Sequence, residues 1–375
     1  MPSSVLIIAG EMSGEEHAMS FFPRLQELRP DLQFWGVGGD LLAKRGVELK
    51  YHLKDFSSMG FSEVIGKIPF YRNALRSLVD EAVKRGTTDA ILVDFQDFNL
   101  RLAQRLKKKN IRVWYYVAPQ AWAWRAHRAG TLAKTVQRLF TILPFEAKWF
   151  RDRKVSQVTP IPHPLIGTYA SQLARLPARP WREGLLKNPR LILLPGSRRS
   201  EVAPLLPIFV ETVKELRKEI PGLHVTMARV SHVDARYFAP AEGVVDQWIT
   251  PEELPEALLK SDLALAASGT VTLGTGLLGV PTVVTYKSSL LNEFILRKVV
   301  RYFDTISLTN LVLGELVFPE YTQAEVQAPI LKAAMLRWLR DPILWNETEQ
   351  KLARLPGMMR AGESDVGALL AREMT

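Results

Sequence analysis

The amino-acid sequence predicts an α/β protein built from two Rossmann-like domains. Short apolar runs typical of buried strands alternate with amphipathic stretches typical of helices, and this alternation begins again in the second half of the chain. The length of 375 residues also favours two domains over one. Because strands that alternate with helices form parallel sheets covered on both faces, we expect two such sheets, a cleft between the domains and further helices at the C-terminal end.

The first half of the chain opens with an apolar run at residues 5–9. The run follows no basic leader, so we interpret it as a strand and not as a signal peptide. The pattern then predicts strands at 32–37, 90–93, 113–117, 138–143 and 155–161. It predicts helices at 16–28, at 62–85 with a break at Pro69, at 100–109 and at 145–152. We assign residues 1–170 to an N-terminal Rossmann-like domain.

The second half repeats this pattern after a segment with many proline and arginine residues, at 174–188. It predicts strands at 191–195, 225–230, 263–267 and 282–286. We assign residues 186–340 to a C-terminal Rossmann-like domain. We expect residues 341–375 to form helices that pack back on the N-terminal domain or on a partner subunit.

Composition limits the chemistry that the chain can perform. Cysteine is absent, which excludes disulfides, thiolate catalysis and cysteine metal sites. The six histidines are scattered, so we expect no metal site and no cofactor. The net charge of +10 favours anionic partners, but the basic residues are dispersed and we expect no nucleic-acid binding. No apolar stretch is long enough to span a membrane.

Two loops of the second half have the features of an anion site. The run LILLPGSRR at 191–199 leads from a strand through Gly196 and Ser197 into a helix, so free N–H groups and Arg198 can face a phosphate. An ordinary connection with solvated arginines is the alternative interpretation. A second strand-to-helix turn, at Ser268, Gly269 and Thr270, is another helix N-terminus suited to an anion, with hydroxyl donors on the serine and the threonine.

Three loops of the first half follow predicted strands, at the edge of the sheet where such proteins bind ligands. The first contains Ser13 and Gly14, and its glycines allow a ligand to approach the backbone. The second contains Asp97, a candidate general base, although Asp97 or Asn99 can instead be a helix N-cap. In the third, Trp122 and Arg125 can line an apolar site and stack, or Trp122 can simply fill a core.

Residues 64–72 combine apolar and basic side chains in the way that suits a helix at an anionic bilayer. The apolar residues are Val64, Ile65, Ile68 and Phe70, and the basic ones include Lys67 and Arg72. The alternative is a core helix of the first domain. If the apolar cluster projects, we expect Leu75, Leu78 and Val79 to pack inward.

Nine segments, in register, resemble the lipid-A-disaccharide synthase family. They are GEMSGEEHA (10–18), GVGGDLLAKRGVE (36–48), SSMGFSEVIGKIP (57–69), DFQDFN (94–99), APQAWAWR (118–125), HPL (163–165), LLPGSRRSEV (193–202), ASGTVTL (267–273) and TNLVLGELVFPEYTQ (309–323). Single motifs of this kind are weak, but nine in the same order over nearly the whole chain are specific.

The resemblance implies an inverting glycosyltransferase of the two-domain GT-B type. Such enzymes join UDP-2,3-diacylglucosamine to 2,3-diacylglucosamine 1-phosphate, form the β-1′,6-linked disaccharide of lipid A and release UDP, here without a metal or cofactor. By the same resemblance, the N-terminal domain takes the acceptor and meets the membrane, and the C-terminal domain binds the UDP-sugar. The enzyme is expected to be cytoplasmic, peripheral on the anionic inner face of the bacterial cytoplasmic membrane, and able to form a homodimer.

The resemblance also implies roles for individual residues. Asp97 is the expected base, and Arg198 is expected to hold the UDP diphosphate. Asn310 and Gln323 match positions near the nucleotide and the cleft. Ser13 and Gly14 match the loop that faces the reacting sugars, together with Asn99, Trp122 and Arg125.

The chain departs from the family pattern at four positions. Gly274 follows Leu273 where the family has a glutamate suited to the ribose hydroxyls, so Gly274→Glu is expected to tighten UDP binding unless Glu320 or another acid already reaches the ribose. Gln96 replaces a proline, Pro162 a glycine and Glu15 an aspartate. Two further readings therefore stay open: a family member without turnover that binds acylated sugar phosphates or a membrane, and another nucleotide-sugar enzyme of the same fold, such as an epimerase.

Overall fold

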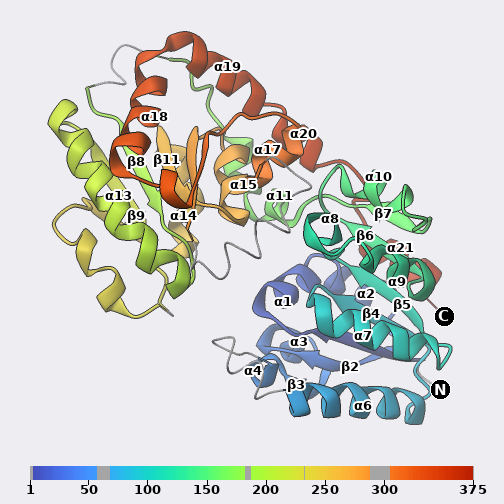
Figure 1. Ribbon diagram of the computed structural model, residues 1–375. Coiled ribbons are helices and arrows are strands. Elements are labelled where there is room, and N and C mark those ends of the chain that lie inside the picture. The colour runs from blue at the N-terminus through green and yellow to red at the C-terminus, as the bar shows by residue number, and fades with distance from the viewer. Residues whose placement is uncertain (1–2, 57–67, 182–186, 232, 288–304, 375) are drawn as a thin grey trace. The chain divides into compact units, whose positions relative to one another are not determined.

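The computed structural model describes residues 3–56, 68–181, 187–231, 233–287 and 305–374 (Figure 1). The chain forms two compact units. Unit 1 comprises Met1–Gly167 and Met359–Thr375, and unit 2 comprises Thr168–Met358. The helices α18 (Ala328–Arg340) and α19 (Pro342–Leu352) therefore belong to unit 2, whereas α21 (Val366–Glu373) belongs to unit 1.

Unit 1 contains a parallel sheet of seven described strands in the order β3-β2-β1-β4-β5-β6-β7. The strands are β1 (Ser3–Ala9), β2 (Leu32–Gly38), β3 (Glu48–His52), β4 (Asp89–Val93), β5 (Arg112–Tyr116), β6 (Arg138–Thr141) and β7 (Val158–Pro160). The helices are α1 (Met12–Met19), α2 (Phe22–Leu28), α3 (Asp40–Lys44), α4 (Leu53–Phe56), α6 (Ile68–Lys84), α7 (Gln96–Lys107), α8 (Ala121–Trp124), α9 (Arg128–Thr135), α10 (Glu146–Arg151) and α11 (Pro164–Thr168).

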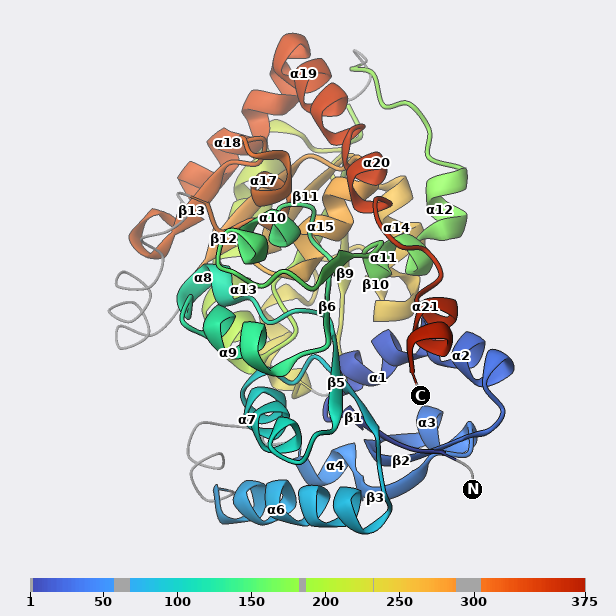
Figure 2. The same ribbon diagram turned by 90° about the vertical axis from the view of Figure 1, so that its right-hand side faces the viewer.

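Successive residues of β1 supply the two cores of unit 1, because neighbouring side chains of a strand point to opposite faces. Leu6 and Ile8 belong to the core that also contains Leu78 of α6 and Leu102 of α7. Val5 and Ile7 belong to the other core, with apolar residues of α1, α2 and α21. Figure 2 shows α6 on one side of the sheet and α2 with α21 on the other. The sheet is thus covered on both faces, as the alternation of elements predicts.

Unit 2 contains a parallel sheet of six described strands in the order β10-β9-β8-β11-β12-β13. The strands are β8 (Arg190–Leu194), β9 (His224–Ala228), β10 (Gln247–Ile249), β11 (Leu263–Ala267), β12 (Thr282–Tyr286) and β13 (Glu320–Thr322). The other α-helices of this unit are α12 (Ala170–Ala174), α13 (Arg199–Glu219), α14 (Leu254–Lys260), α15 (Thr270–Leu277) and α17 (Leu308–Leu313), and α20 (Leu355–Met359) ends at its boundary.

Both sheets have the strand order of a doubly wound fold, which confirms the predicted fold class. In each, the first strand lies inside the sheet, and the chain builds outward on one side of it before it crosses to the other. The order therefore reverses between β1 and β4 in unit 1 and between β8 and β11 in unit 2. Ligands of such sheets bind at the carboxyl ends of the strands that flank the reversal.

Several elements differ from the expected ones. The helix expected at 16–28 is two helices, α1 and α2, because Pro23 in the first turn of α2 cannot continue a helix that precedes it. Helix α7 begins at Gln96, four residues before the expected start at Leu100. The strands β3, β10 and β13 were not expected, because they are short edge strands without a continuous apolar run.

Candidate functional site

The turn after β4 has an unusual backbone that fixes the start of α7. Asp94 and Phe95 both have positive φ, 46° and 45°, and Phe95 is the N-cap residue of α7. Asn99 holds this turn: its buried side-chain amide donates to the backbone oxygens of Val93 at 3.2 Å and Asp94 at 2.8 Å. Neither Asp97 nor Asn99 is therefore the N-cap, and the buried Asn99 side chain supports the loop from within.

The Phe95 ring joins this turn to the loop after β1. A Cβ atom on Gly10 would lie 2.4 Å from Cδ1 of Phe95, so only glycine allows the ring to lie there. In the same loop, Gly14 is buried and its Cβ position lies 3.5 Å from the Val93 oxygen. Ser13 is exposed in the first turn of α1. The loops after β1 and β4 are thus packed together at the reversal of the strand order.

Asp97, the candidate general base, accepts hydrogen bonds from two arginines. Its Oδ1 lies 2.7 Å from Nη1 of Arg125 and 2.5 Å from Nη2 of Arg128. The Arg128 side chain is only 4% exposed and also donates to Oε1 of Gln96 at 2.8 Å, whereas the Asp97 side chain is 63% exposed. No hydrogen-bond donor in the described part of the chain contacts Oδ2 of Asp97. One carboxylate oxygen is therefore fixed and the other faces outward.

Trp122 fills the core, which was one of the two interpretations of the APQAWAWR segment. Its indole N–H donates to Oε1 of Glu146 at 2.8 Å, and its ring packs edge-on against Phe145. Glu146 also accepts the N–H groups of Ile142 and Leu143, yet burial raises its pKa to about 7. Trp122 thus anchors α8, while Arg125 at the end of that helix reaches Asp97.

A cavity of about 500 Å³ lies beside Asp97. It is lined by Glu11, Ile68, Tyr71, Arg72, Leu75, Asp94, Phe95, Gln96, Asp97, Phe98 and Arg101. Glu11 and Asp94 come from the loops that follow β1 and β4, so the cavity lies where the strand order of unit 1 reverses. Burial, with the nearby charge of Glu11, raises the pKa of Asp94 to about 6. Its size and its mixture of apolar and polar groups suit a small-molecule site.

Helix α6 borders this cavity, and part of the expected membrane segment lies on it. Ile68 is 47% exposed and Arg72 is exposed, while Leu75, Leu78 and Val79 are buried. Phe70 packs edge-on against Phe56 and is half-buried. Val64, Ile65 and Lys67 lie outside the described residues.

In unit 2, the turn from β8 into α13 is stabilised by the carboxylate of Glu201, which lies in the first turn of α13. Glu201 accepts the N–H groups of Ser197 at 2.9 Å and Arg198 at 3.2 Å, and its Oε1 pairs with Nη1 of Arg198 at 3.0 Å. Gly196 has φ of 113°, and a Cβ there would lie 2.4 Å from Glu201. Glycine is therefore required both by the backbone and by the Glu201 side chain.

The two expected anion loops of unit 2 share a cavity of about 350 Å³. Gly196, Ser197 and Arg198 line it from the β8 side, and Ser268, Gly269 and Thr270 line it from the β11 side. The strand order of unit 2 reverses between these strands. Arg199 is not among the lining residues, and its guanidinium lies 5.1 Å from the ring centre of Tyr237. The structure thus brings together six of the eight residues expected to bind UDP.

Asn310 and Gln323 do not line this cavity. The Asn310 side chain is buried, donates to Phe318 O and Glu320, and accepts the N–H groups of Val317 and Phe318. Glu320 also accepts from Thr305, Ile306 and Ser307. Asn310 and Glu320 therefore stabilise the segment between α17 and β13. The carboxylate of Glu320 is already occupied by these hydrogen bonds.

Gly274 lies inside α15, packed against Tyr169. A Cβ atom at Gly274 would lie 2.7 Å from the Tyr169 hydroxyl and 3.2 Å from the ring, and Tyr169 is 5% exposed. Glu15, another departure from the family pattern, is buried and accepts the N–H groups of Gly39 and Leu42, so it joins α1 to α3. Both residues therefore have structural partners of their own.

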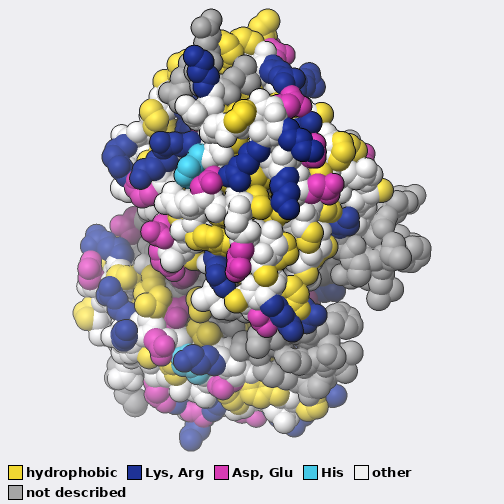
Figure 3. Space-filling view, turned by 90° about the vertical axis from the view of Figure 1, so that its left-hand side faces the viewer, with side chains coloured by type: hydrophobic (Ala, Val, Ile, Leu, Met, Phe, Trp, Pro, Cys, Tyr) yellow, Lys and Arg dark blue, Asp and Glu magenta, His cyan; other side chains and the backbone are white. Residues whose placement is uncertain are grey.

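On the face that Figure 3 presents, basic residues do not gather in one band. Figure 3 shows Lys and Arg side chains interspersed with Asp and Glu over the face that it presents. Among the described residues, no helix has both the length and the apolar character needed to cross a membrane.

Comparison with known proteins identifies the family. The family model described as lipid-A-disaccharide synthetase matches residues 5–354. This chain belongs to the lipid-A-disaccharide synthase family. It is 38% identical to the lipid-A-disaccharide synthase of Myxococcus xanthus over 383 aligned positions, which cover 100% of this chain and 97% of that protein. It is 32% identical to that of Geobacter sulfurreducens, with 96% and 93% covered. The expected enzyme class, a disaccharide-forming glycosyltransferase, is confirmed.

Solved structures confirm the expected GT-B fold. The glycosyltransferase of kitacinnamycin superposes with a TM-score of 0.61 at 14% identity and covers 100% of both chains. The UDP-GlcNAc 2-epimerase of Neisseria meningitidis, solved with UDP-GlcNAc, gives 0.55 at 13% identity and covers 98% of both. At these identities the likeness concerns the fold alone.

Sequence reasoning missed several residues of the candidate site. Arg128 is three residues after Arg125, but nothing in that spacing indicates that both reach Asp97. Glu11, Arg101 and Tyr71 line the cavity without belonging to any expected site. Glu201 had a local signal, since an acidic residue three positions after the helix N-cap is typical of a capping box.

Proposed function

We propose that this chain joins UDP-2,3-diacylglucosamine to 2,3-diacylglucosamine 1-phosphate, forms the β-1′,6-linked lipid A disaccharide and releases UDP. The observation that carries the proposal is the pair of cavities at the two strand-order reversals, one with a held carboxylate and one with two helix N-termini and an arginine. Family membership supplies the reaction class, and the two cavities supply one site for each substrate.

The acceptor half of the reaction is assigned to Asp97. Its Oδ1 is bound by Arg125 and Arg128, which leaves Oδ2 to accept the proton of the acceptor 6-hydroxyl. The buried Arg128 sets the direction of the carboxylate, because its own position is fixed by burial and by Gln96. Arg125 and Arg128 are therefore positioning residues.

The donor half is assigned to the cavity of unit 2. The Arg198 side chain is 76% exposed, and its ion pair with Glu201 is an exposed pair of the kind that contributes little to stability. Arg198 can therefore turn to a diphosphate at small cost. Gly269 and Thr270 add N–H donors and Thr270 adds a hydroxyl at the start of α15, whereas Ser268 already donates its N–H to Thr285 O and its hydroxyl to Ile306 O, both at 2.8 Å.

The chemistry is a single displacement at the anomeric carbon. The bond from C1 to the acceptor O6 forms as the bond from C1 to the diphosphate oxygen breaks, and the configuration inverts. Asp97 takes the proton of the hydroxyl, and the charge that develops on UDP is met by Arg198 and the helix N-termini.

We also propose that the enzyme works at the anionic inner face of the bacterial cytoplasmic membrane, because both substrates carry acyl chains. The exposed Ile68 and Arg72 on α6, at the rim of the acceptor cavity, support this. Ile68→Ser is expected to weaken sedimentation with anionic vesicles at an unchanged melting temperature. Ile343→Ser, at an isoleucine of unit 2 that is 73% exposed, is the matched control.

The reaction assay tests the proposal. Purified protein is incubated with UDP-2,3-diacylglucosamine and 2,3-diacylglucosamine 1-phosphate, and disaccharide and UDP are measured. Equal amounts of both products support the proposal. UDP without disaccharide would indicate hydrolysis or another acceptor, and neither product would favour a family member that binds without turnover.

A further inference from the structure

Two arginines at the rim of the unit 1 cavity have no ionic partner among the described residues. Arg72 comes from α6 and Arg101 from α7, and both line the cavity beside Asp97. Both are exposed, and neither forms a hydrogen bond or ion pair with any described residue. Their two positive charges are therefore available to a ligand that enters the cavity.

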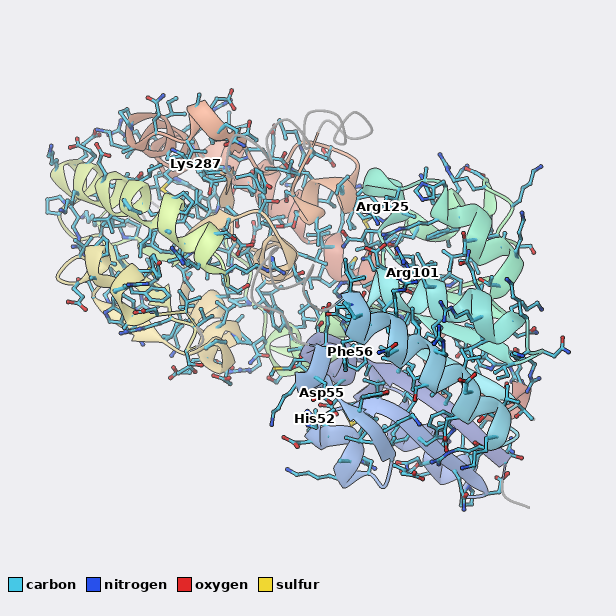
Figure 4. All side chains as sticks on the ribbon, turned by 60° about the horizontal axis from the view of Figure 1, so that its bottom comes forward. His52, Asp55, Phe56, Arg101, Arg125 and Lys287 are labelled. Atoms are coloured by element: carbon cyan, nitrogen blue, oxygen red, sulfur yellow. The ribbon has the colours of Figure 1, made fainter. Side chains whose placement is uncertain are left out.

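The absence of an ion pair at Arg101 among the described residues is informative because an acidic residue, Asp97, lies close to it on the same helix. Asp97 and Arg101 are four residues apart on α7, the spacing at which an acidic and a basic side chain pair on a helix. Asp97 instead pairs with Arg125 and Arg128, and this leaves Arg101 uncompensated. Figure 4 shows Arg101, which lies on α7, and Arg125, which lies at the end of α8. The Asp97 carboxylate is thus neutralised by arginines that do not belong to α7, and Arg101 of α7 remains without an ionic partner among the described residues.

The remaining lining limits the ligand. Besides the arginines, the lining includes the apolar side chains of Ile68, Leu75 and Phe98 and three carboxylates, those of Glu11, Asp94 and Asp97. A ligand that fits has an apolar part, hydroxyl groups near the carboxylates and one anionic group near the arginines. A nucleoside diphosphate has no acyl chain for the apolar residues, and it brings more negative charge to the three carboxylates than a single phosphate does.

We propose that Arg101 and Arg72 bind the 1-phosphate of the acceptor lipid. The inference rests on the proposed function, since it takes the acceptor from the reaction assigned above. Side chains at positions i and i+4 lie about 5–6 Å apart at Cβ, so one sugar ring can span from Asp97 to Arg101. The 6-hydroxyl then reaches Asp97 while the 1-phosphate, on the other side of the ring oxygen, reaches Arg101 and Arg72, and an acyl chain follows Ile68 and Leu75. The guanidinium groups thus select a phosphorylated acceptor.

The test compares two acceptors that differ only in the phosphate, 2,3-diacylglucosamine 1-phosphate and 2,3-diacylglucosamine. For each enzyme, kcat/KM is measured on both acceptors at saturating UDP-2,3-diacylglucosamine, and the ratio gives the preference for the phosphate. We expect Arg101→Ala to lower this ratio at least about tenfold, and Arg72→Ala to lower it as well, because a charge-assisted bond to phosphate is lost. The KM for the UDP-sugar should not change.

Arg105→Ala on α7 and Arg76→Ala on α6 are the matched controls, since both arginines are exposed and neither lines the cavity. They should keep the wild-type ratio. A wild-type ratio in Arg101→Ala and Arg72→Ala would overturn the inference and leave the proposed function intact. An unchanged ratio together with weaker binding to phosphatidylglycerol vesicles would assign the two arginines to lipid headgroups instead.

A separate measurement keeps the inference testable if the wild type forms no disaccharide. Equilibrium binding of the two acceptors is then compared in the wild type and in Arg101→Ala. A preference of the wild type for the phosphorylated lipid that Arg101→Ala loses supports the inference, even though the proposed function has failed. Equal preference in both proteins overturns it.

Discussion

The carboxylate of Asp97 is bound by the buried guanidinium of Arg128, with 2.5 Å between Oδ1 and Nη2. The pair links an exposed acid on α7 to a side chain fixed inside unit 1. Because Arg125 binds the same oxygen, the other carboxylate oxygen has a set direction. A base that is oriented before substrate binds avoids the cost of ordering it during the reaction.

Removal of Arg128 should therefore harm turnover more than binding. We expect Arg128→Ala to lower kcat at least about tenfold with little change in the KM for the UDP-sugar, because Asp97 loses its fixed partner. Arg125→Ala should have a smaller effect, since the Arg125 side chain is 38% exposed and constrains the carboxylate less. Steady-state kinetics with a thermal melt of each variant check this. An Arg128→Ala enzyme that melts normally and keeps its kcat would show that the pair has no role in positioning.

The two neighbouring arginines of unit 2 should differ in UDP binding. Arg198→Ala is expected to weaken UDP binding by about 2 kcal/mol through the loss of charge-assisted bonds. Arg199→Ala should do less, because Arg199 lies against Tyr237 and does not line the cavity. Isothermal titration with UDP measures both. A larger loss for Arg199→Ala would reverse the assignment.

The structure changes what is expected of Gly274→Glu. From the sequence alone, a glutamate at this position would restore a ribose contact and tighten UDP binding. The Cβ atom would instead lie 2.7 Å from the buried Tyr169 hydroxyl, so we expect a loss of stability on the order of 2–3 kcal/mol and no tighter binding. Thermal melts and UDP titration test this, with Tyr169→Ala/Gly274→Glu as the control that removes the clash. Tighter UDP binding by a stable Gly274→Glu protein would show that the sequence expectation was right.

Glu146 should make stability fall as pH rises. Burial raises its pKa from 4.5 to about 7, so the folded protein binds more protons than the unfolded chain between these values. The stabilisation is complete below pH 4.5 and is lost as pH rises through 7, and it amounts to on the order of 3 kcal/mol. Urea unfolding at pH 5 and pH 8 measures the difference. Glu146→Gln, which cannot titrate, should show a smaller difference, and the same difference as the wild type would exclude Glu146 as its source.

The fold was predictable because its central strands are buried on both faces and are therefore continuously apolar, as residues 5–9 and 263–267 illustrate. The edge strands were not predictable. Residues 247–249 and 320–322 are only three residues long, too short to show a strand pattern, and only pairing with their neighbours in the sheet makes them strands. Pro23 was visible in the sequence and could have divided the helix expected at 16–28.

The candidate site was predictable where the sequence itself sets the backbone. Gly196 and the residues around it are adjacent in the chain, and the loops after β8 and β11 meet because parallel strands end at one edge. Contacts between distant segments were not predictable: that Arg128 pairs with Asp97, or that Tyr169 packs on Gly274, depends on packing which no local pattern encodes. The same holds for Asn310, whose hydrogen bonds all remain inside unit 2.

The measurement that tests the central claim most directly is the turnover of Asp97→Asn with both lipid substrates, read beside its affinity for UDP. Asparagine keeps the size of the side chain but cannot accept the proton of the 6-hydroxyl at neutral pH. We expect disaccharide formation to fall at least about a hundredfold while the Kd for UDP stays at the wild-type value. An Asp97→Asn enzyme with near wild-type turnover would contradict the assignment of Asp97 as the base.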